Sequence, residues 1–134
     1  MHKPTTPPTP PTGTRGPTPG QRAEEAACNY LRAHGLRLIA RNFRCRRGEI
    51  DLIMQDTDNL VFVEVRYRRQ SRYGSGLESV DRHKQDRIVH CAMYYLQRHP
   101  QAARSAARFD VVALRPAPDG LRIDWVRNAF DASP

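Results

Sequence analysis

The chain has 134 residues, enough for one domain with a modest hydrophobic core, and its formal net charge is +8. A basic balance of this size predicts an acidic partner, of which nucleic acid is the commonest, although a soluble basic surface without a partner explains the charge equally well. No apolar stretch is long enough to span a membrane, and the N-terminus lacks the apolar run of a signal peptide, so we do not expect a membrane protein.

The N-terminal segment differs sharply in composition from the rest of the chain. Residues 1–20 are nearly all Pro, Thr and Gly, and such a segment buries too little apolar area to offset its ordering entropy. We predict a disordered tail there and a single folded domain over 21–134. Apolar residues then recur at helical spacing over 23–34, with Glu24 at the edge of the apolar stripe and Glu25 pointing away.

The elements that follow predict the fold class. A second apolar stripe at helical spacing predicts a helix over 80–99. Apolar runs predict strands at 36–44, in the two arms of a hairpin over 48–68, at 108–114 and at 121–126. The order is therefore helix, three strands, helix, two strands. This order predicts an α/β fold with a mixed sheet of about five strands flanked by helices.

The cysteines predict the redox setting. Cys28, Cys45 and Cys91 are widely spaced, odd in number and form no CxxC pair. This pattern supports neither a zinc knuckle nor a disulfide framework, and it gives Cys45 no partner. The sequence therefore favours a reducing, cytoplasmic setting, with Cys91 packing on the apolar stripe of its helix.

The hairpin over 48–68 carries acidic side chains within otherwise apolar strands. A turn at 56–59 sets a register in which every pair on one side is apolar. On the other side Asp51 faces Glu64, and Glu49 faces Arg66, which we interpret as a structural ion pair. Because directly opposed carboxylates are destabilising, the first pair predicts a divalent cation such as Mg²⁺ between its two acids. Neutralisation by nearby arginines is the alternative.

Several motifs together resemble one known family. "GEIDLI", "LVFVEVRYR", "RFDVV" and "NAF", with "AEEAACNYL" and "VDRHKQDRI", lie within residues 21–130 and resemble the YraN-like family of small bacterial proteins. That family is considered nuclease-like, within the PD-(D/E)XK or restriction-endonuclease-like superfamily, with kinship to archaeal-type Holliday junction resolvases. The resemblance implies a restriction-endonuclease-like fold and a Mg²⁺-dependent (or Mn²⁺-dependent) endonuclease acting on DNA, including branched DNA. Superfamily analogy also suggests a homodimer.

The resemblance implies a site residue by residue. The motif acids fall on Asp51, Glu64 and Glu24, with the main-chain carbonyl of Val65 as a further ligand of the metal, which would activate a water for attack on a phosphodiester. The superfamily's lysine is replaced by Arg66, which can clamp a phosphate but cannot act as a general base. A nucleic-acid-binding module with weak or lost catalysis is therefore the alternative function.

Basic side chains near the motif acids predict where a polynucleotide binds. They flank the acids on both sides and are interleaved with tyrosines, a pattern that suits phosphate contacts and base stacking. Lys84 on the second helix either reaches the site in place of the missing lysine or extends along the surface into solvent, the commoner behaviour. A third interpretation is a protein-interaction factor that uses this basic face. The predicted nucleic-acid contacts are Arg44, Arg46, Arg47, Arg68, Arg69, Arg72 and Lys84.

Overall fold

The structure is a computed structural model that describes residues 16–69 and 80–132. Its sheet has five strands in the order β1-β2-β3-β4-β5, in which β3 and β4 are parallel and the other neighbours are antiparallel. The elements are α1 (Pro19–Ala33), β1 (Arg37–Cys45), β2 (Gly48–Asp56), β3 (Asn59–Tyr67), α2 (Arg82–Arg98), the 3-10 turn η2 (Ala102–Arg104), β4 (Ala106–Ala117) and β5 (Gly120–Phe130). The predicted α/β class and mixed sheet are confirmed, and the architecture is consistent with a restriction-endonuclease-like fold.

Helix α1 begins two residues before the predicted start of the domain because it has a complete N-terminal cap. The Thr18 hydroxyl accepts from the Gln21 N–H at 3.1 Å, and the Gln21 side chain accepts from the Thr18 N–H at 2.8 Å. Pro19 then supplies a first helical residue whose missing N–H needs no partner. Residues 1–15 of the predicted tail lie outside the described residues.

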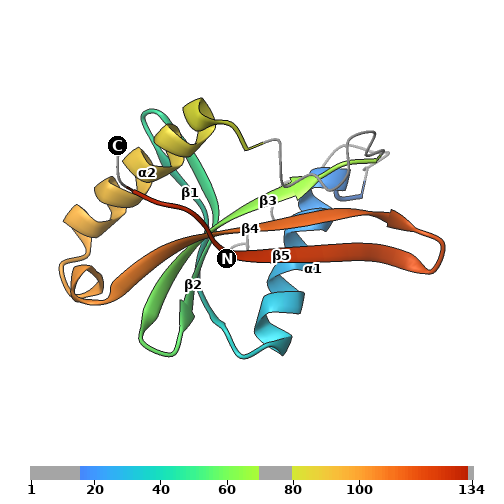
Figure 1. Cartoon of the computed structure of the whole chain (residues 1–134), viewed down its shortest axis with the longest axis horizontal. Coiled ribbons are helices and arrows are strands. Elements are labelled where there is room, and N and C mark those ends of the chain that lie inside the picture. Colours follow the sequence, from blue (N-terminus) through green and yellow to red (C-terminus); the bar gives the residue numbers. More distant parts are fainter. Residues whose placement is uncertain (1–15, 70–79, 133–134) are drawn as a thin grey trace, which may run out of the picture.

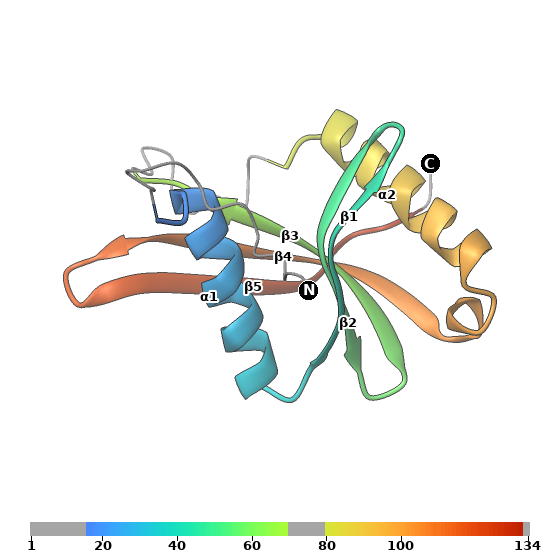
Figure 2. The same cartoon turned by 180° about the vertical axis from the view of Figure 1, so that it is seen from behind.

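The two helices cover opposite faces of the sheet, so both faces carry a buried core (Figures 1 and 2). The α1 face buries Leu31 of the helix against strand residues that include Leu52, Met54, Val61, Val63, Val112 and Leu114. The α2 face buries Ile88, Cys91 and Tyr95 of the helix against Ile50, Ile53, Phe62 and Phe109. Because β2 and β3 are covered on both faces, they form the centre of the molecule.

The predicted hairpin register is confirmed at its turn end and fails at its open end. Backbone pairing runs from Asp56↔Asn59 to Leu52↔Val63 and stops there. Strict alternation would place Ile50 beside Leu52, but Ile50 packs in the α2-side core. β2 therefore leaves the ladder at Asp51, and this change positions the site described below.

The predicted pair of Glu49 with Arg66 is wrong for the same reason. Glu49 lies opposite Arg44 of β1 in the β1–β2 register. Its carboxylate is 3.4 Å from Arg44 Nε and accepts a hydrogen bond of 2.9 Å from the Asn42 amide. Once β2 has separated from β3, its acidic end is paired with β1.

The expectation of unpaired cysteines is also wrong. Cys45, at the end of β1, and Cys91, in the middle of α2, form a disulfide across a sequence separation of 46 residues. Cys28 is free and buried in the α1-side core. The disulfide joins two elements that come together only in the folded chain, so cysteine spacing does not reveal it. Within the described residues, none of the helices combines the length and apolar character that a membrane crossing requires.

Candidate functional site

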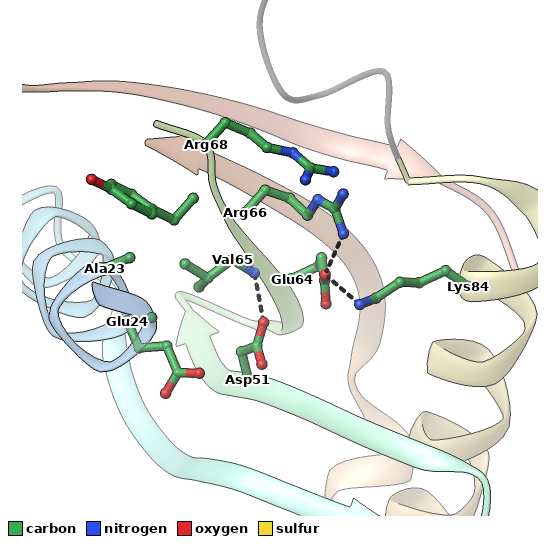
Figure 3. Close-up of a pocket in the computed structure, with 10 residues that line it drawn as sticks. Ala23, Glu24, Asp51, Glu64, Val65, Arg66, Arg68 and Lys84 are labelled. Carbon is green, nitrogen blue, oxygen red and sulfur yellow. Dashed lines mark hydrogen bonds and ion pairs between the residues drawn. The ribbon is translucent and has the colours of Figure 1, made fainter. Parts of the chain in front are cut away.

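A pocket of about 380 Å³ opens where β2 and β3 separate. Both helices reach it from opposite sides, and the two strands supply its floor (Figure 3). It is lined by Gly20, Ala23, Glu24, Asp51, Glu64, Val65, Arg66, Tyr67, Arg68 and Lys84. The four residues predicted as catalytic therefore lie together, although they come from α1, β2 and β3.

The Asp51 side chain occupies the gap between the separating strands. Its Oδ2 accepts a hydrogen bond of 2.8 Å from the backbone N–H of Val65. A carboxylate thus takes the place of the strand carbonyl that would otherwise satisfy this N–H, which fixes Asp51 against β3. The predicted contribution of Val65 was its carbonyl, which stays a prediction.

Three carboxylates, one from α1 and two from β2, converge beside this pocket. Glu24, Glu49 and Asp51 each offer an oxygen, and these oxygens lie within 4.8 Å of one another. Clustered carboxylate oxygens suit a hard divalent cation such as Mg²⁺ or Mn²⁺. Glu49 is an addition to the predicted set; its spacing of two from Asp51 along β2 is the signal that could have revealed it.

Asn42 holds two of these acids in position. Its amide Nδ2 donates to Glu24 Oε1 at 3.1 Å and to Glu49 Oε2 at 2.9 Å. Asn42 adopts a left-handed backbone conformation with φ of 48°, which Asn tolerates better than most residues. This bridge between α1, β1 and β2 has no signature in the strand pattern, and sequence reasoning missed it.

The surroundings of Asp51 raise the pKa of its carboxyl to about 8. Burial is the largest cause, and the negative charges of Glu64, Glu24 and Glu49 add to it, while the Val65 N–H acts in the opposite direction. Without a cation, Asp51 is therefore mainly protonated at neutral pH. The ionised form of this carboxylate cluster is unfavourable without a counter-charge, and a bound divalent cation would supply that charge. These residues therefore fit the predicted metal.

Glu64 lies on the other side of the pocket, where two cations face it. Its side chain is 4% exposed, with Oε2 at 3.1 Å from Lys84 Nζ and 3.6 Å from Arg66 Nη1. Lys84 therefore points into the pocket, and the expectation that it extends into solvent is wrong (Figure 3). A lysine in the first turn lies at the positive end of the helix dipole, so the pairing with Glu64 offsets an unfavourable position.

Comparisons with known proteins place the chain in a family. The model of "Uncharacterised protein family UPF0102" matches residues 23–114, the stretch that contains every acid of the pocket. The chain belongs to the UPF0102 family. UPF0102 proteins of Nitrosococcus oceani and Methylococcus capsulatus are each 50% identical to it, over 83% and 90% of this chain and 90% and 96% of theirs. This agrees with the resemblance to the YraN-like family, because the UPF0102 family is YraN-like.

One solved structure shows a weak likeness to this UPF0102 protein. It is that of Pyrococcus furiosus SfsA in complex with Ca²⁺, with 14% sequence identity and a TM-score of 0.37. The match covers 81% of this chain and 62% of SfsA. A likeness at this level carries no argument about the pocket.

The other basic residues predicted to bind nucleic acid are dispersed over this UPF0102 protein. Arg68 lines the acidic pocket. Arg44 and Arg46 instead line a separate cavity of about 500 Å³ beside the disulfide. Arg47 and Arg69 are exposed and line neither cavity. The remaining predicted contact, Arg72, lies outside the described residues.

Proposed function

We propose that this UPF0102 protein is a Mg²⁺-dependent (or Mn²⁺-dependent) endonuclease that hydrolyses phosphodiester bonds in DNA, branched DNA included. The observation that carries the proposal is the convergence of the Glu24, Glu49 and Asp51 carboxylates at a pocket that Glu24, Asp51 and Lys84 line. The motif resemblance to PD-(D/E)XK nucleases and Holliday junction resolvases supports it, as does the fold. A DNA substrate implies a cytoplasmic location, and two strands to cut would suit a homodimer.

In the proposed reaction the acidic residues would bind the cation, and the basic residues would bind the phosphate. Glu24, Glu49 and Asp51 would hold the cation, with Glu64 as the further predicted ligand. A bound divalent cation supplies Lewis-acid stabilisation of the phosphate and lowers the pKa of a water. Lys84 and Arg66 place positive charge beside the same pocket, where they orient a phosphate and stabilise the negative charge that develops on it.

A cleavage assay tests the proposal. Purified protein is incubated with linear duplex, single-stranded and four-way-junction DNA in Mg²⁺, Mn²⁺ or EDTA, and the products are resolved on denaturing gels. We expect cutting that requires the metal. DNA binding that weakens with salt but never leads to cutting would instead support the binding-module alternative. The absence of DNA affinity at physiological salt would support a protein-interaction factor.

Lys84 supplies the lysine that the sequence motif lacks, so its removal is expected to slow cleavage strongly. Lys84→Met deletes the ammonium group near Glu64 with a side chain of similar length, and we expect a loss of roughly 100-fold in the cleavage rate. Arg66→Lys keeps a positive charge and should change the rate much less. Single-turnover cleavage under saturating protein measures both.

The matched control for Lys84 is Arg82→Met. Arg82 is an exposed residue of the same first turn of α2 that pairs with Asp86 and does not line the pocket. Arg82→Met removes the same positive charge outside the pocket, so it should leave the cleavage rate nearly unchanged. Equal rates for Lys84→Met and wild type would show that Lys84 takes no part in cleavage.

The raised pKa of Asp51 predicts that Mg²⁺ binding depends on pH. Because the cation binds the ionised carboxylate, the affinity should rise about tenfold per pH unit up to about pH 8 and level off above it. About one proton should be released per bound Mg²⁺ at pH 7, since Asp51 is mainly protonated there. Calorimetric titrations in buffers of different ionisation enthalpy measure both quantities. An affinity that does not change between pH 6 and pH 8 would contradict this assignment.

A further inference from the structure

The sheet continues beyond the pocket on the side where β4 and β5 extend. Ile123 and Trp125 of β5 pack on the α1-side core, so α1 covers one face of this extension. On the other face α2 packs against β1 and β2, and neither described helix crosses the far end of β4 and β5 (Figure 1). This face of the far end is therefore accessible among the described elements.

Three arginines lie side by side across this accessible face. Arg115 of β4 is directly opposite Arg122 of β5. The Arg68 N–H donates to the Leu114 carbonyl at 3.0 Å, which extends the parallel β3–β4 register by one position and brings Arg68 alongside Arg115. We call Arg68, Arg115 and Arg122 the arginine row.

The arginine row continues the basic side of the acidic pocket. Glu64 and Arg66 of β3 and Arg68 directly after its end are spaced two residues apart, so their side chains leave the same face of the sheet (Figure 3). Arg68 also lines the pocket directly. The positive side chains therefore run from Lys84 and Arg66 to the far strand β5 without changing face.

Arg115 and Arg122 place like charges directly opposite each other on neighbouring strands, an arrangement that destabilises the fold. Within the described part of the chain, Arg122 has one acidic partner, Asp124 Oδ2 at 3.4 Å, and its own side chain remains 58% exposed. Neither Arg68 nor Arg115 contacts an acid among the described residues. Three adjacent guanidinium groups with one carboxylate favour a ligand that carries several negative charges at regular spacing.

The side chains around the row favour a duplex over a single strand. Single-strand sites combine basic groups with exposed aromatic rings on which bases stack. The positions of β3, β4 and β5 that share the face of the row around it are Arg66, Val111, Ala113, Asp124 and Val126. None of these is aromatic, so the face can contact phosphates but offers no stacking platform.

We infer that the arginine row binds backbone phosphates of a double-stranded segment of the substrate and thereby directs the adjoining strand into the acidic pocket. This inference rests on the proposed function for the identity of the substrate as DNA, and it adds where the uncut part of that substrate lies. The row contributes binding and positioning and takes no part in the bond cleavage.

Binding of a short labelled DNA duplex in EDTA tests the inference, because binding is then measured without cutting. We expect Arg115→Gln/Arg122→Gln to weaken binding roughly tenfold and to make the dependence of log Kd on log salt concentration less steep by about 2. Arg115→Lys/Arg122→Lys keeps the charge and should retain most of the affinity. The melting temperature should be unchanged or higher in the Gln variant, because a like-charge pair has been removed.

The matched control is Arg32→Gln/Arg37→Gln, which removes the same charge from exposed positions on α1 and β1. If the control weakens binding as much as the row variant, net charge alone is responsible and the inference fails. The inference is also overturned if Arg115→Gln/Arg122→Gln loses as much affinity for a single strand of the same length as it loses for the duplex. Cleavage that persists while the row variants bind normally refutes only this inference. Row-dependent binding without any cutting in Mg²⁺ refutes only the proposed function.

Discussion

Asp51→Asn is expected to lower metal-dependent cleavage by about 1000-fold or more. The substitution removes one negative oxygen from the cluster with Glu24 and Glu49, and with it a ligand that the cation needs. A loss of this size corresponds to about 4 kcal/mol of transition-state stabilisation, which is in the range that a metal ion supplies to phosphoryl transfer. Single-turnover cleavage and Mg²⁺ titration of the variant measure the effect.

The same substitution should stabilise the metal-free fold at alkaline pH. The Asn side-chain oxygen can still accept from the Val65 N–H, and Asn resembles the protonated form of Asp51 that burial favours. The folded-state pKa is raised from 3.8 to about 8, so the wild type loses stability as pH rises from about 4 through 8. The variant lacks this loss. Urea unfolding in EDTA at pH 6 and pH 9 compares the two proteins.

Glu25→Gln is the control for Asp51→Asn. Glu25 follows Glu24 on α1 but is exposed and pairs with Arg41 at 2.7 Å, outside the acidic pocket. Glu25→Gln replaces one carboxyl group by an amide, as Asp51→Asn does, and should leave cleavage unchanged. Cutting by Asp51→Asn at the wild-type rate would show that the reaction takes place elsewhere or needs no metal held here.

The hairpin register and the position of Glu24 could be predicted because both depend on local sequence patterns. Apolar alternation set the hairpin register from Leu52↔Val63 to its turn, and helical periodicity placed Glu24 at the edge of the buried stripe, where the structure has it half-buried. These features depend on residues close in sequence. The motif acids Asp51 and Glu64 consequently reached the same pocket as expected.

The features that sequence reasoning missed depend on contacts between distant elements. Ile50 turns toward the α2-side core because both faces of the sheet are covered, and the next residue, Asp51, has its carboxylate near those of Glu24 and Glu49. Lys84 enters the pocket because α2 begins beside β3, which no periodicity in the helix reveals. Expected exposure of a lysine is a statistical preference, and a buried carboxylate overrides it.

The disulfide between β1 and α2 should contribute about 4 kcal/mol to the free energy of unfolding. It closes a loop with a sequence separation of 46 residues, and the loss of loop entropy in the unfolded chain gives this magnitude. Cys45→Ser/Cys91→Ser, or reduction of the wild type, should lower stability by that amount in urea unfolding. The double variant is its own control, since a reductant should not affect it further.

Reduction is expected to lower stability without stopping cleavage, although the disulfide lies on the helix that carries Lys84. Cys91 and Lys84 belong to the same helix, and the disulfide ties that helix to the end of β1 next to Arg44, the partner of Glu49. The DNA substrate that we propose implies a reducing compartment, where the two cysteines would be thiols, so cleavage should persist after reduction while thermal stability falls. If reduction leaves the urea midpoint of the wild type unchanged, the covalent link contributes nothing, and core packing alone holds α2 in place.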